Sequence, residues 1–572
     1  MKKTQKILTE LMLVALGATV CAQNAKAAAQ QSQNEAIEEE IELPDVTTVV
    51  NGKTFTAGKD SVPDYTKILP ETQSPQVQLP VMDDVKAPKS APESQIATDA
   101  KEKDIYAEGE LGAGYPFYFK GDFSVYRASG NAPFEIDFSH ESSEGLAGKK
   151  ASEGYFERET AVHGKKSLFS TYGTHSIEGE YKMSDDGLQL KSESYSDMVK
   201  HTISGKGSSD WTTPKGFLIS YGADGAWFNR YGEIMKDSVT TDDCLDSTKV
   251  LDLNPYLGFG WQGHGFKALF TALYGLQANL ASSDNLYKAD GSSSAESSHR
   301  GQFKLAASWG NDFMNVFADG SLIVGTAIGS KDVIPVFTLG ADFTLESFTD
   351  GRFVTIGVKG GIDSYQQKIR TLENTYRFAF APALPTETSD WFGSVDVSVP
   401  ILEIFEAKVG AQFRKTVFGN GVWEADYSTM FTDGTTFNPG LYAILSKERT
   451  EFNTDIGFYA DISSVKAGVQ WLSFWKDVPV LEDEQEIRLS LEYQSLDARW
   501  NAGTSTTLAF GDDADTCPNI SGWAGIRLAS ALSVAFELND VIKLFGRESR
   551  EYAHSKYITT SGNAVLLVKF QF

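Results

Sequence analysis

Apolar and polar residues alternate along most of this 572-residue chain, from about Asp104 to Phe572. Successive side chains of a β-strand point to opposite faces, so a period of two predicts strands. No run of 18 or more apolar residues follows the N-terminal segment, and membrane-spanning helices are therefore not predicted. The clearest alternating segments are 117–125, 134–138, 302–309, 394–399, 406–413, 465–471, 487–494 and 532–539.

Alternation fits both a soluble sandwich and a membrane barrel, because each has one apolar and one polar face. A sandwich fold would require three or four tandem domains. We find no Pro- or Gly-rich linker and no internal repeat that would divide residues 104–572. At about 20–25 residues for a membrane strand and its turn, the region predicts one all-β, antiparallel transmembrane barrel of about 18–22 strands.

Composition agrees with a barrel and excludes one class of partner. The chain has 36 Phe, 22 Tyr and 10 Trp, and aromatic girdles flank the apolar band of membrane barrels. The net charge is −26, whereas nucleic-acid binding needs clustered Lys and Arg. Nucleic acid is therefore not an expected partner, and outer-membrane lipid is.

The first 22 residues have the features of a signal peptide, which predicts export. Three lysines precede a short apolar run at 11–20, and Val20-Cys21-Ala22 offers a small-residue cleavage site before Gln23. A lipid anchor on Cys21 is the alternative, but the residues just before it match that motif poorly.

Residues 23–103 are predicted to be a disordered, Pro-rich, acidic tail in the periplasm. Few large apolar residues are present, so the segment cannot bury enough surface to offset the entropy of ordering. One β-prone island, residues 41–52, interrupts it. The candidate partner-docking residues in this island are Leu43, Pro44, Asp45, Val46, Val49 and Val50.

The last strand of the chain has the pattern of an assembly signal. One face of residues 564–572 is apolar at every second position and ends in an aromatic residue. This resembles the C-terminal signal of bacterial outer-membrane barrels, which implies recognition by the barrel assembly machinery. The residues that carry the pattern are Leu566, Val568, Phe570 and Phe572.

The island and the two ends of the chain resemble TonB-dependent receptors. The island starts Leu43-Pro44-Asp45 and ends at Gly52, like a TonB box, and the final hairpins occupy 531–572. The resemblance implies docking of a periplasmic partner by strand addition. It also implies a folded plug between box and barrel, for which residues 53–103 are too few. We therefore expect a plugless relative whose lumen is open, filled by its loops or tail, or closed by a separate plug-like protein.

No catalytic motif is present, so an enzyme is not expected. The seven His residues are scattered without metal-ligand spacing, and most are expected in loops or in the lumen. No cofactor is expected. Ca²⁺ at two acidic clusters is the alternative to simple solvated loops. The clusters are Asp242, Asp243 and Asp246, and Asp512, Asp513 and Asp515.

Two cysteines remain after cleavage, Cys244 and Cys517, both in acidic, loop-like surroundings. A disulfide between them and two unpaired loop cysteines are both compatible with the sequence.

The candidate functional surface is the polar face of the strands, which lines the lumen of a barrel. Side chains of both signs suit a hydrated pore. Candidate lining residues are Lys304, Asp396, Lys408, Arg414, Lys466, Arg488, Glu492 and Glu537. The leading hypothesis is a channel or transport protein that passes a small solute across the outer membrane, gated or coupled by a periplasmic partner. The alternative is a structural barrel that anchors a periplasmic complex or displays adhesive loops.

Overall fold

The computed structural model describes residues 48–50, 53–55 and 105–571, the last range without 129, 131, 194, 235–246, 281–296, 329–332, 347–351, 432–438, 513, 560 and 561. The chain forms two compact units, Met1–Thr98 and Asp99–Phe572. In the first unit the described residues form a hairpin of β1 (Thr48–Val50) and β2 (Lys53–Phe55), in which Thr48 pairs with Phe55.

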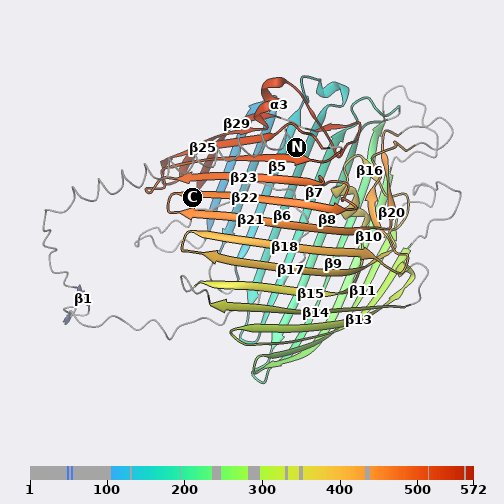
Figure 1. The fold of residues 1–572 in the computed structure, drawn as a ribbon, viewed down its shortest axis with the longest axis vertical. Coiled ribbons are helices and arrows are strands. Elements are labelled where there is room, and N and C mark those ends of the chain that lie inside the picture. The colour runs from blue at the N-terminus through green and yellow to red at the C-terminus, as the bar shows by residue number, and fades with distance from the viewer. Residues whose placement is uncertain are drawn as a thin grey trace, which may run out of the picture. The chain divides into compact units, whose positions relative to one another are not determined.

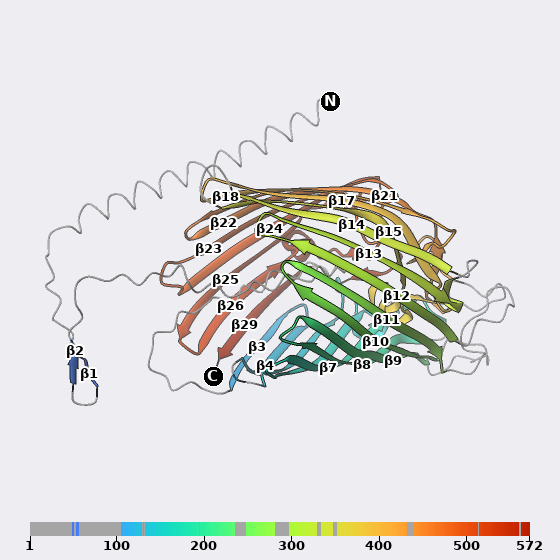
Figure 2. The ribbon, with the colours of Figure 1, turned by 90° about the horizontal axis from the view of Figure 1, so that it is seen from below.

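The second unit is a single closed barrel of antiparallel strands (Figures 1 and 2), which confirms the predicted fold class. Its 22 strands, at the upper limit of the predicted range, are β3 (Tyr106–Tyr115), β4 (Tyr118–Arg127), β5 (Phe134–Glu144), β6 (Phe156–Phe169), β7 (Gly173–Gly187), β8 (Tyr195–Thr212), β9 (Phe217–Ile234), β10 (Ser247–Gly263), β11 (Phe266–Asn279), β12 (Ser297–Gly310), β13 (Met314–Gly325), β14 (Val333–Glu346), β15 (Phe353–Gln366), β17 (Glu387–Ile401), β18 (Phe405–Thr416), β21 (Thr450–Ile462), β22 (Val465–Lys476), β23 (Gln485–Gln494), β24 (Trp500–Phe510), β25 (Asn519–Ala529), β26 (Leu532–Asn539) and β29 (Asn563–Gln571).

Each barrel strand pairs with the barrel strands before and after it in the chain, and β29 closes the ring against β3. Leu566 lies opposite Ala113, and Leu567 lies opposite Gly112. A Cβ atom added to Gly112 would lie 2.4 Å from a methyl carbon of Leu567, so the glycine makes room for this side chain at the seam. Leu567 is fully buried beside Tyr118 and Val565.

The connections divide the barrel into a short-turn end and a long-loop end. At the short-turn end, residues 264–265 join β10 to β11 and residues 463–464 join β21 to β22. β3 begins and β29 ends at this same end. The opposite end carries the longest connections, including 367–386, 417–449 and 540–562. At this end β5 continues to Glu144, and residues 145–155 join it to β6.

The outer face of the barrel is apolar. Leu111, Phe303, Leu339 and Phe458 are between 51% and 57% exposed, and each alternates with residues that face inward. Trp211, Trp261, Trp309 and Trp500 lie on strands near the short-turn end. An apolar band with an aromatic border is the surface expected of a barrel whose outside contacts lipid.

Four histidines depart from the expectation that most would lie in loops or in the lumen. His140, His175, His201 and His299 lie on barrel strands and pack against aromatic rings. His201 stacks between Tyr181 and Tyr231 on the outer face, with ring centroids 6.1 and 5.8 Å away. The residue-by-residue alternation of β5, β7, β8 and β12 carries these side chains outward.

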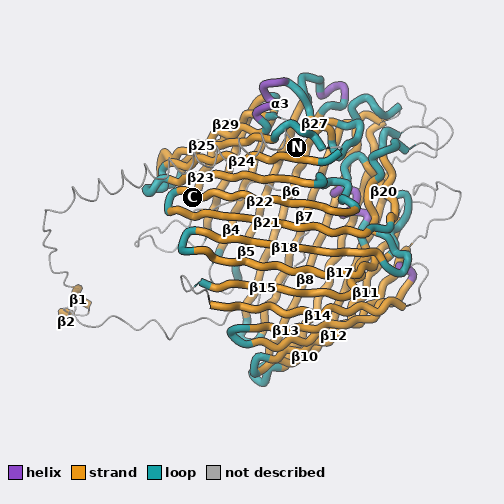
Figure 3. Tube along the Cα trace, in the orientation of Figure 1, coloured by secondary structure: helices purple, strands orange, loops and turns teal. Residues whose placement is uncertain are grey.

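Helices are few and lie in the loops, as the purple segments of Figure 3 show. They are η2 (Ala151–Glu153), η3 (Thr326–Ile328), α2 (Ile369–Thr375) and α3 (Val541–Gly546). Among the described residues, no helix has the length and apolar character needed to cross a membrane.

Candidate gate inside the barrel

The described residues of three connections at the long-loop end fold together into one element, which we call the cap; the connections are 367–386, 417–449 and 540–562. The first contains α2 and β16 (Ala379–Phe380), the second contains β19 (Val422–Ala425) and β20 (Tyr442–Lys447), and the third contains α3, β27 (Arg550–Glu551) and β28 (Ile558–Thr559). β16 pairs with β20 in parallel, and β20 pairs with β19 in antiparallel fashion. The sheet thus ties the first connection to the second.

The cap has a hydrophobic core that includes the barrel wall. Met198 on β8, Phe228 on β9 and Val250 on β10 are at most 2% exposed and belong to the same buried cluster as the cap residues. These wall residues occupy the alternation positions opposite the exposed apolar ones, so their side chains face inward. The cap therefore lies inside the barrel wall. It contacts β8, β9 and β10, although its three connections join β15 to β17, β18 to β21 and β26 to β29. The cap members of the cluster are Ile369, Leu372, Phe378, Ala379, Phe380, Ala381, Leu384, Trp423, Ala425, Tyr427, Leu441, Tyr442, Ile444 and Tyr557.

Aromatic stacking joins the third connection to the other two. The rings of Phe378 and Tyr557 are parallel, with centroids 3.9 Å apart. Tyr427 contacts Tyr442 and Tyr552 edge to face, at 5.1 and 5.5 Å. Such pairs contribute about 0.5–1.5 kcal/mol each beyond their buried area. The cap is therefore a packed body rather than three separate loops.

Charged residues of the first connection bind the barrel wall across the lumen. Arg370 forms an ion pair with Asp252 of β10 at 3.1 Å. Arg377 pairs with Asp186 of β7 at 2.5 Å and with Glu157 of β6 at 3.2 Å. Arg370 and Glu373 lie three positions apart on α2 and so share one side of this helix, whereas Arg377 follows the end of α2 at Thr375.

The most deeply buried pair joins Glu373 of α2 to Arg230 of β9. The Arg230 Nε and a Glu373 carboxylate oxygen are 3.0 Å apart, and the side chains are 1% and 0% exposed. The other Glu373 oxygen accepts a hydrogen bond from the backbone N–H of Ala381. Lys200 of β8 donates to the Glu373 carbonyl oxygen. A buried charge without a partner is strongly destabilising, so separating the cap from the wall at this point would be unfavourable unless water reached both groups.

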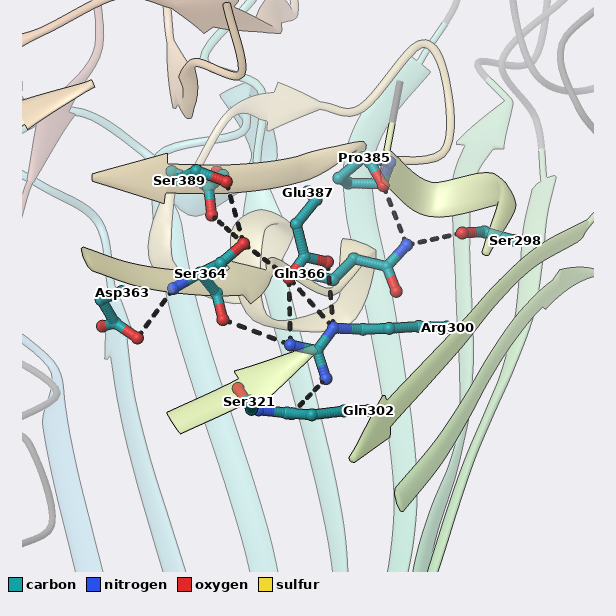
Figure 4. Close-up of polar contacts among 11 residues, drawn as sticks. Ser298, Arg300, Gln302, Ser321, Asp363, Ser364, Gln366, Pro385, Glu387 and Ser389 are labelled. Carbon is teal, nitrogen blue, oxygen red and sulfur yellow. Dashed lines mark hydrogen bonds and ion pairs between the residues drawn. The ribbon is translucent and has the colours of Figure 1, made fainter. Parts of the chain in front are cut away.

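A second polar cluster joins the long-loop ends of β12, β15 and β17 (Figure 4). Arg300 donates from both Nε and Nη2 to the carboxylate of Glu387, at 3.0 Å, and from Nη2 to the carbonyl oxygen of Ser364. The Ser364 hydroxyl also bonds Glu387 and Ser389. Glu387 is fully buried where β17 leaves the cap, so this forked pair fixes the root of the first connection.

The connection 477–484 borders the cap, with Val480 packed against its core. Burial, and then the nearby negative charge of Glu486, raise the pKa of Glu482 to about 7. Across the cap, burial and then Lys149 lower the pKa of Lys191 to about 8, and its ammonium lies 4.4 Å from the centre of the Tyr557 ring. Both groups therefore change charge near neutral pH at the edge of the cap.

The predicted lumen residues occupy the strand faces opposite exposed apolar side chains, and most pair with other charges. Lys304 pairs with Asp319 at 3.4 Å, Arg414 pairs with Asp390 at 3.5 Å, and Arg488 pairs with Glu486 at 2.6 Å. Asp396 on β17 and Glu537 on β26 lie apart from these pairs.

Lys408, Lys466 and Glu492 come together near the short-turn end, where they line one pocket of about 410 Å³ with Tyr459 and Asp461. Lys408 lies 5.2 Å from the centre of the Tyr459 ring. The sequence pattern thus points to a surface of both signs, and no single charge dominates this pocket.

Some residues of the predicted docking island and assembly signal lie outside the described residues. Leu43, Pro44, Asp45 and Val46 do, whereas Val49 and Val50 form part of β1. Phe572 also lies outside, and Leu566, Val568 and Phe570 lie on β29, where Leu566 is 54% exposed.

The structure describes only some of the residues involved in the cysteine and calcium predictions. Cys517 forms no disulfide with any described residue, and Cys244 lies outside them. Asp242, Asp243, Asp246 and Asp513 also lie outside. Asp515 pairs with Arg550 at 2.8 Å and with Lys543 at 3.5 Å, so arginine and lysine already neutralise this carboxylate.

The sequence pattern did not identify the cap. Its segments do not alternate, and the helix in 369–375 is too short to show a period. One signal was available: Arg370 and Glu373 have the spacing of one helical face, and the charged Arg377 comes just before the apolar run 378–381.

No protein-family model matches the chain, and no curated protein sequence matches it. Solved structures do resemble it. The siderophore receptor PirA from Acinetobacter baumannii has a TM-score of 0.57 at 9% identity, over 83% of this chain and 81% of that one. The FrpB iron transporter from Neisseria meningitidis has a TM-score of 0.58 at 7% identity, over 82% of each chain. The copper transporter OprC has a TM-score of 0.57 at 9% identity, over 82% and 80%. At these identities the similarity shows the fold, and this chain shares its large barrel with receptors and transporters of siderophores and metals.

Proposed function

We propose that this protein is an outer-membrane transporter that passes a small solute through its barrel, and that the cap gates the passage. The observation that carries the proposal is the position of the cap. It lies inside the wall, with a shared hydrophobic core and charge pairs reaching β6, β7, β9 and β10. A barrel closed in this way passes a solute only when the cap shifts.

The comparisons support transport as the class of function, because the similar folds are named as siderophore receptors and as iron and copper transporters. The lining of both charge signs supports a hydrophilic solute. No catalytic role, cofactor or bound Ca²⁺ is part of the proposal. In this proposal the protein is a plugless relative of TonB-dependent receptors, and its own loops close the lumen.

Orientation follows from loop length. In outer-membrane barrels short turns are periplasmic and long loops are extracellular. In the proposed orientation the cap lies at the outer opening and β3 starts on the periplasmic side. The signal peptide and a periplasmic tail at 23–103 fit this orientation.

The tail is proposed to couple the barrel to a periplasmic protein through residues 43–50. The β1–β2 hairpin has only two strands, so each strand has an edge that another chain can pair with. A structural barrel that only anchors this partner or displays adhesive loops is the competing function.

Locking the cap tests the gate directly. The side chains of Asn374 on α2 and Thr202 on β8 are hydrogen-bonded at 3.3 Å, so Asn374→Cys with Thr202→Cys should form a cap-to-wall disulfide. The background carries Cys244→Ser and Cys517→Ser. We expect the oxidised protein in planar bilayers to lose its ion conductance, and dithiothreitol to restore it.

The matched control is a disulfide within the wall. Ser176 and Ser208 are bonded across β7 and β8 at 2.6 Å, so Ser176→Cys with Ser208→Cys cross-links the barrel without touching the cap. Its conductance should equal that of the parent. Equal conductance of the oxidised and reduced cap-to-wall pair would contradict a gating cap, and a purified barrel with neither conductance nor a periplasmic partner would contradict transport.

Deleting residues 23–103 while keeping the signal peptide separates the two functions. We expect the shortened protein to keep its heat-modifiable fold and its conductance, and to lose cross-linking to periplasmic proteins. The matched variant Val49→Pro removes one backbone donor from β1 and should lose the same cross-links, because proline cannot complete a strand ladder. Retained cross-linking in both variants would show that the tail is not the docking segment.

A further inference from the structure

A pocket lies at the long-loop rim of the barrel, lined in part by the third connection of the cap. Three segments line its volume of about 520 Å³: the β3–β4 turn, the loop 145–151, and α3 with the residues that follow it. None of the charge pairs between α2 and the wall involves these segments.

The pocket opens beside the lipid-facing surface. Tyr115 is 57% exposed and lies on the same strand face as Leu111, which is 52% exposed. Phe117 is 78% exposed and continues the outer face marked by Phe119. On α3, Phe545 is 77% exposed. The apolar band of the barrel wall thus continues to the edge of the pocket.

Cations dominate the lining, in contrast to the chain's net charge of −26. The pocket contains Lys149, Lys150, Lys543 and Arg547 against Glu144 and Glu548. Glu144 is already paired with Arg158 at 2.6 Å. Lys150 and Arg547 form no ion pair with any described residue, and both are exposed.

Neighbouring side chains hold two of these cations, and close backbone packing positions α3. A Cβ atom on Gly562 would overlap the backbone of Leu544, so α3 packs directly on the residue that precedes β29. Lys543 is anchored between Asp515 and Glu548, at 3.5 and 3.3 Å. The Lys149 ammonium lies 5.0 Å from the centre of the Tyr155 ring.

We propose that this pocket binds the headgroup of an acidic phospholipid, in which no cationic group neutralises the phosphate, with Lys149, Lys150 and Arg547 contacting the phosphate. Phe117 and Phe545 contact the upper part of the acyl chains. Clustered Lys and Arg beside an apolar membrane surface attract acidic lipids, whereas a soluble anion would gain nothing from the aromatic rim. This site does not depend on the cap being a gate.

Hydrogen–deuterium exchange of the full-length protein in nanodiscs tests the proposal. We expect exchange in 145–151 and 541–547 to be slower in dioleoyl phosphatidylglycerol than in dioleoyl phosphatidylcholine, with no difference in 477–484. Native mass spectrometry should show bound phosphatidylglycerol. The variant Lys149→Gln, Lys150→Gln, Arg547→Gln should abolish the difference and weaken lipid binding by at least about tenfold.

The matched control is Lys165→Gln, Lys166→Gln, Lys267→Gln, which removes three exposed cations near the short-turn end and should behave as the parent. Equal exchange in the two lipids would overturn the proposal. So would unchanged lipid binding in the first variant. Equal protection by inorganic phosphate without acidic lipid would identify a soluble-anion site and overturn the lipid assignment.

Discussion

Replacing Glu373 with alanine is expected to open the barrel. The change leaves Arg230, which is 1% exposed, without its carboxylate, and it removes the acceptor for the Ala381 N–H. Breaking a buried pair by removing one partner costs about 3–5 kcal/mol. If that cost falls on the closed cap, the opening equilibrium shifts by at least about a hundredfold. Conductance in planar bilayers and protease cleavage within 367–386 should both increase.

A second variant distinguishes loss of the pair from general damage. Arg230→Met with Glu373→Gln removes both charges but keeps an oxygen for Ala381. Because replacing both members of a buried pair is often neutral, this protein should remain closed. A closed Glu373→Ala protein, or a double variant as leaky as the single one, would contradict the role given to the Arg230–Glu373 pair.

Deleting residues 563–572 is expected to abolish the folded barrel. β29 pairs with β26 on one side and with β3 on the other, so its loss exposes two strand edges. Each unpaired backbone group in lipid costs several kcal/mol. On gels of unheated samples the compact, heat-modifiable band should disappear completely.

Side-chain variants separate closure from the predicted assembly signal. Leu566→Ala, Val568→Ala, Phe570→Ala and Phe572→Ala together keep the strand ladder, so this protein should refold in detergent but fail to reach the membrane in cells. Leu567→Ala should instead refold poorly in detergent but still be directed to the membrane in cells. It loses about 2–5 kcal/mol of packing in detergent but keeps the outward face. Normal membrane insertion of the fourfold variant would refute the signal.

The barrel could be predicted from the sequence because lipid and lumen impose a strict alternation. Segments such as 302–309 and 487–494 carry it clearly, and both are barrel strands. β3 was not among the clearest segments, since glycines at 109, 112 and 114 interrupt its pattern. The number of strands could be predicted only as a range, because it was calculated from an average length for each strand and its turn.

The cap could not be predicted in the same way. Its core forms between residues such as Phe380, Trp423 and Tyr557, which are far apart in the sequence and share no period. Its wall partners, such as Arg230 and Asp252, look like ordinary lumen residues until α2 is placed against them. The candidate lumen list therefore contained none of the charges that hold the cap. Alternation identifies the face of a residue but not its partner.

The position of Tyr557 has a consequence for biogenesis. This residue belongs to the aromatic core of the cap and lies six positions before Asn563, the first residue of β29. β29 pairs with β3, which lies at the other end of the barrel sequence. The segment from Tyr557 to β29 therefore supplies both the strand that seals the wall and an aromatic side chain of the cap core. Such long-range pairing is slow to form. A barrel in which β29 has not yet paired with β3 would therefore also lack its completed cap. An unsealed pore would form only if β29 paired with β3 before the connection 540–562 had packed into the cap.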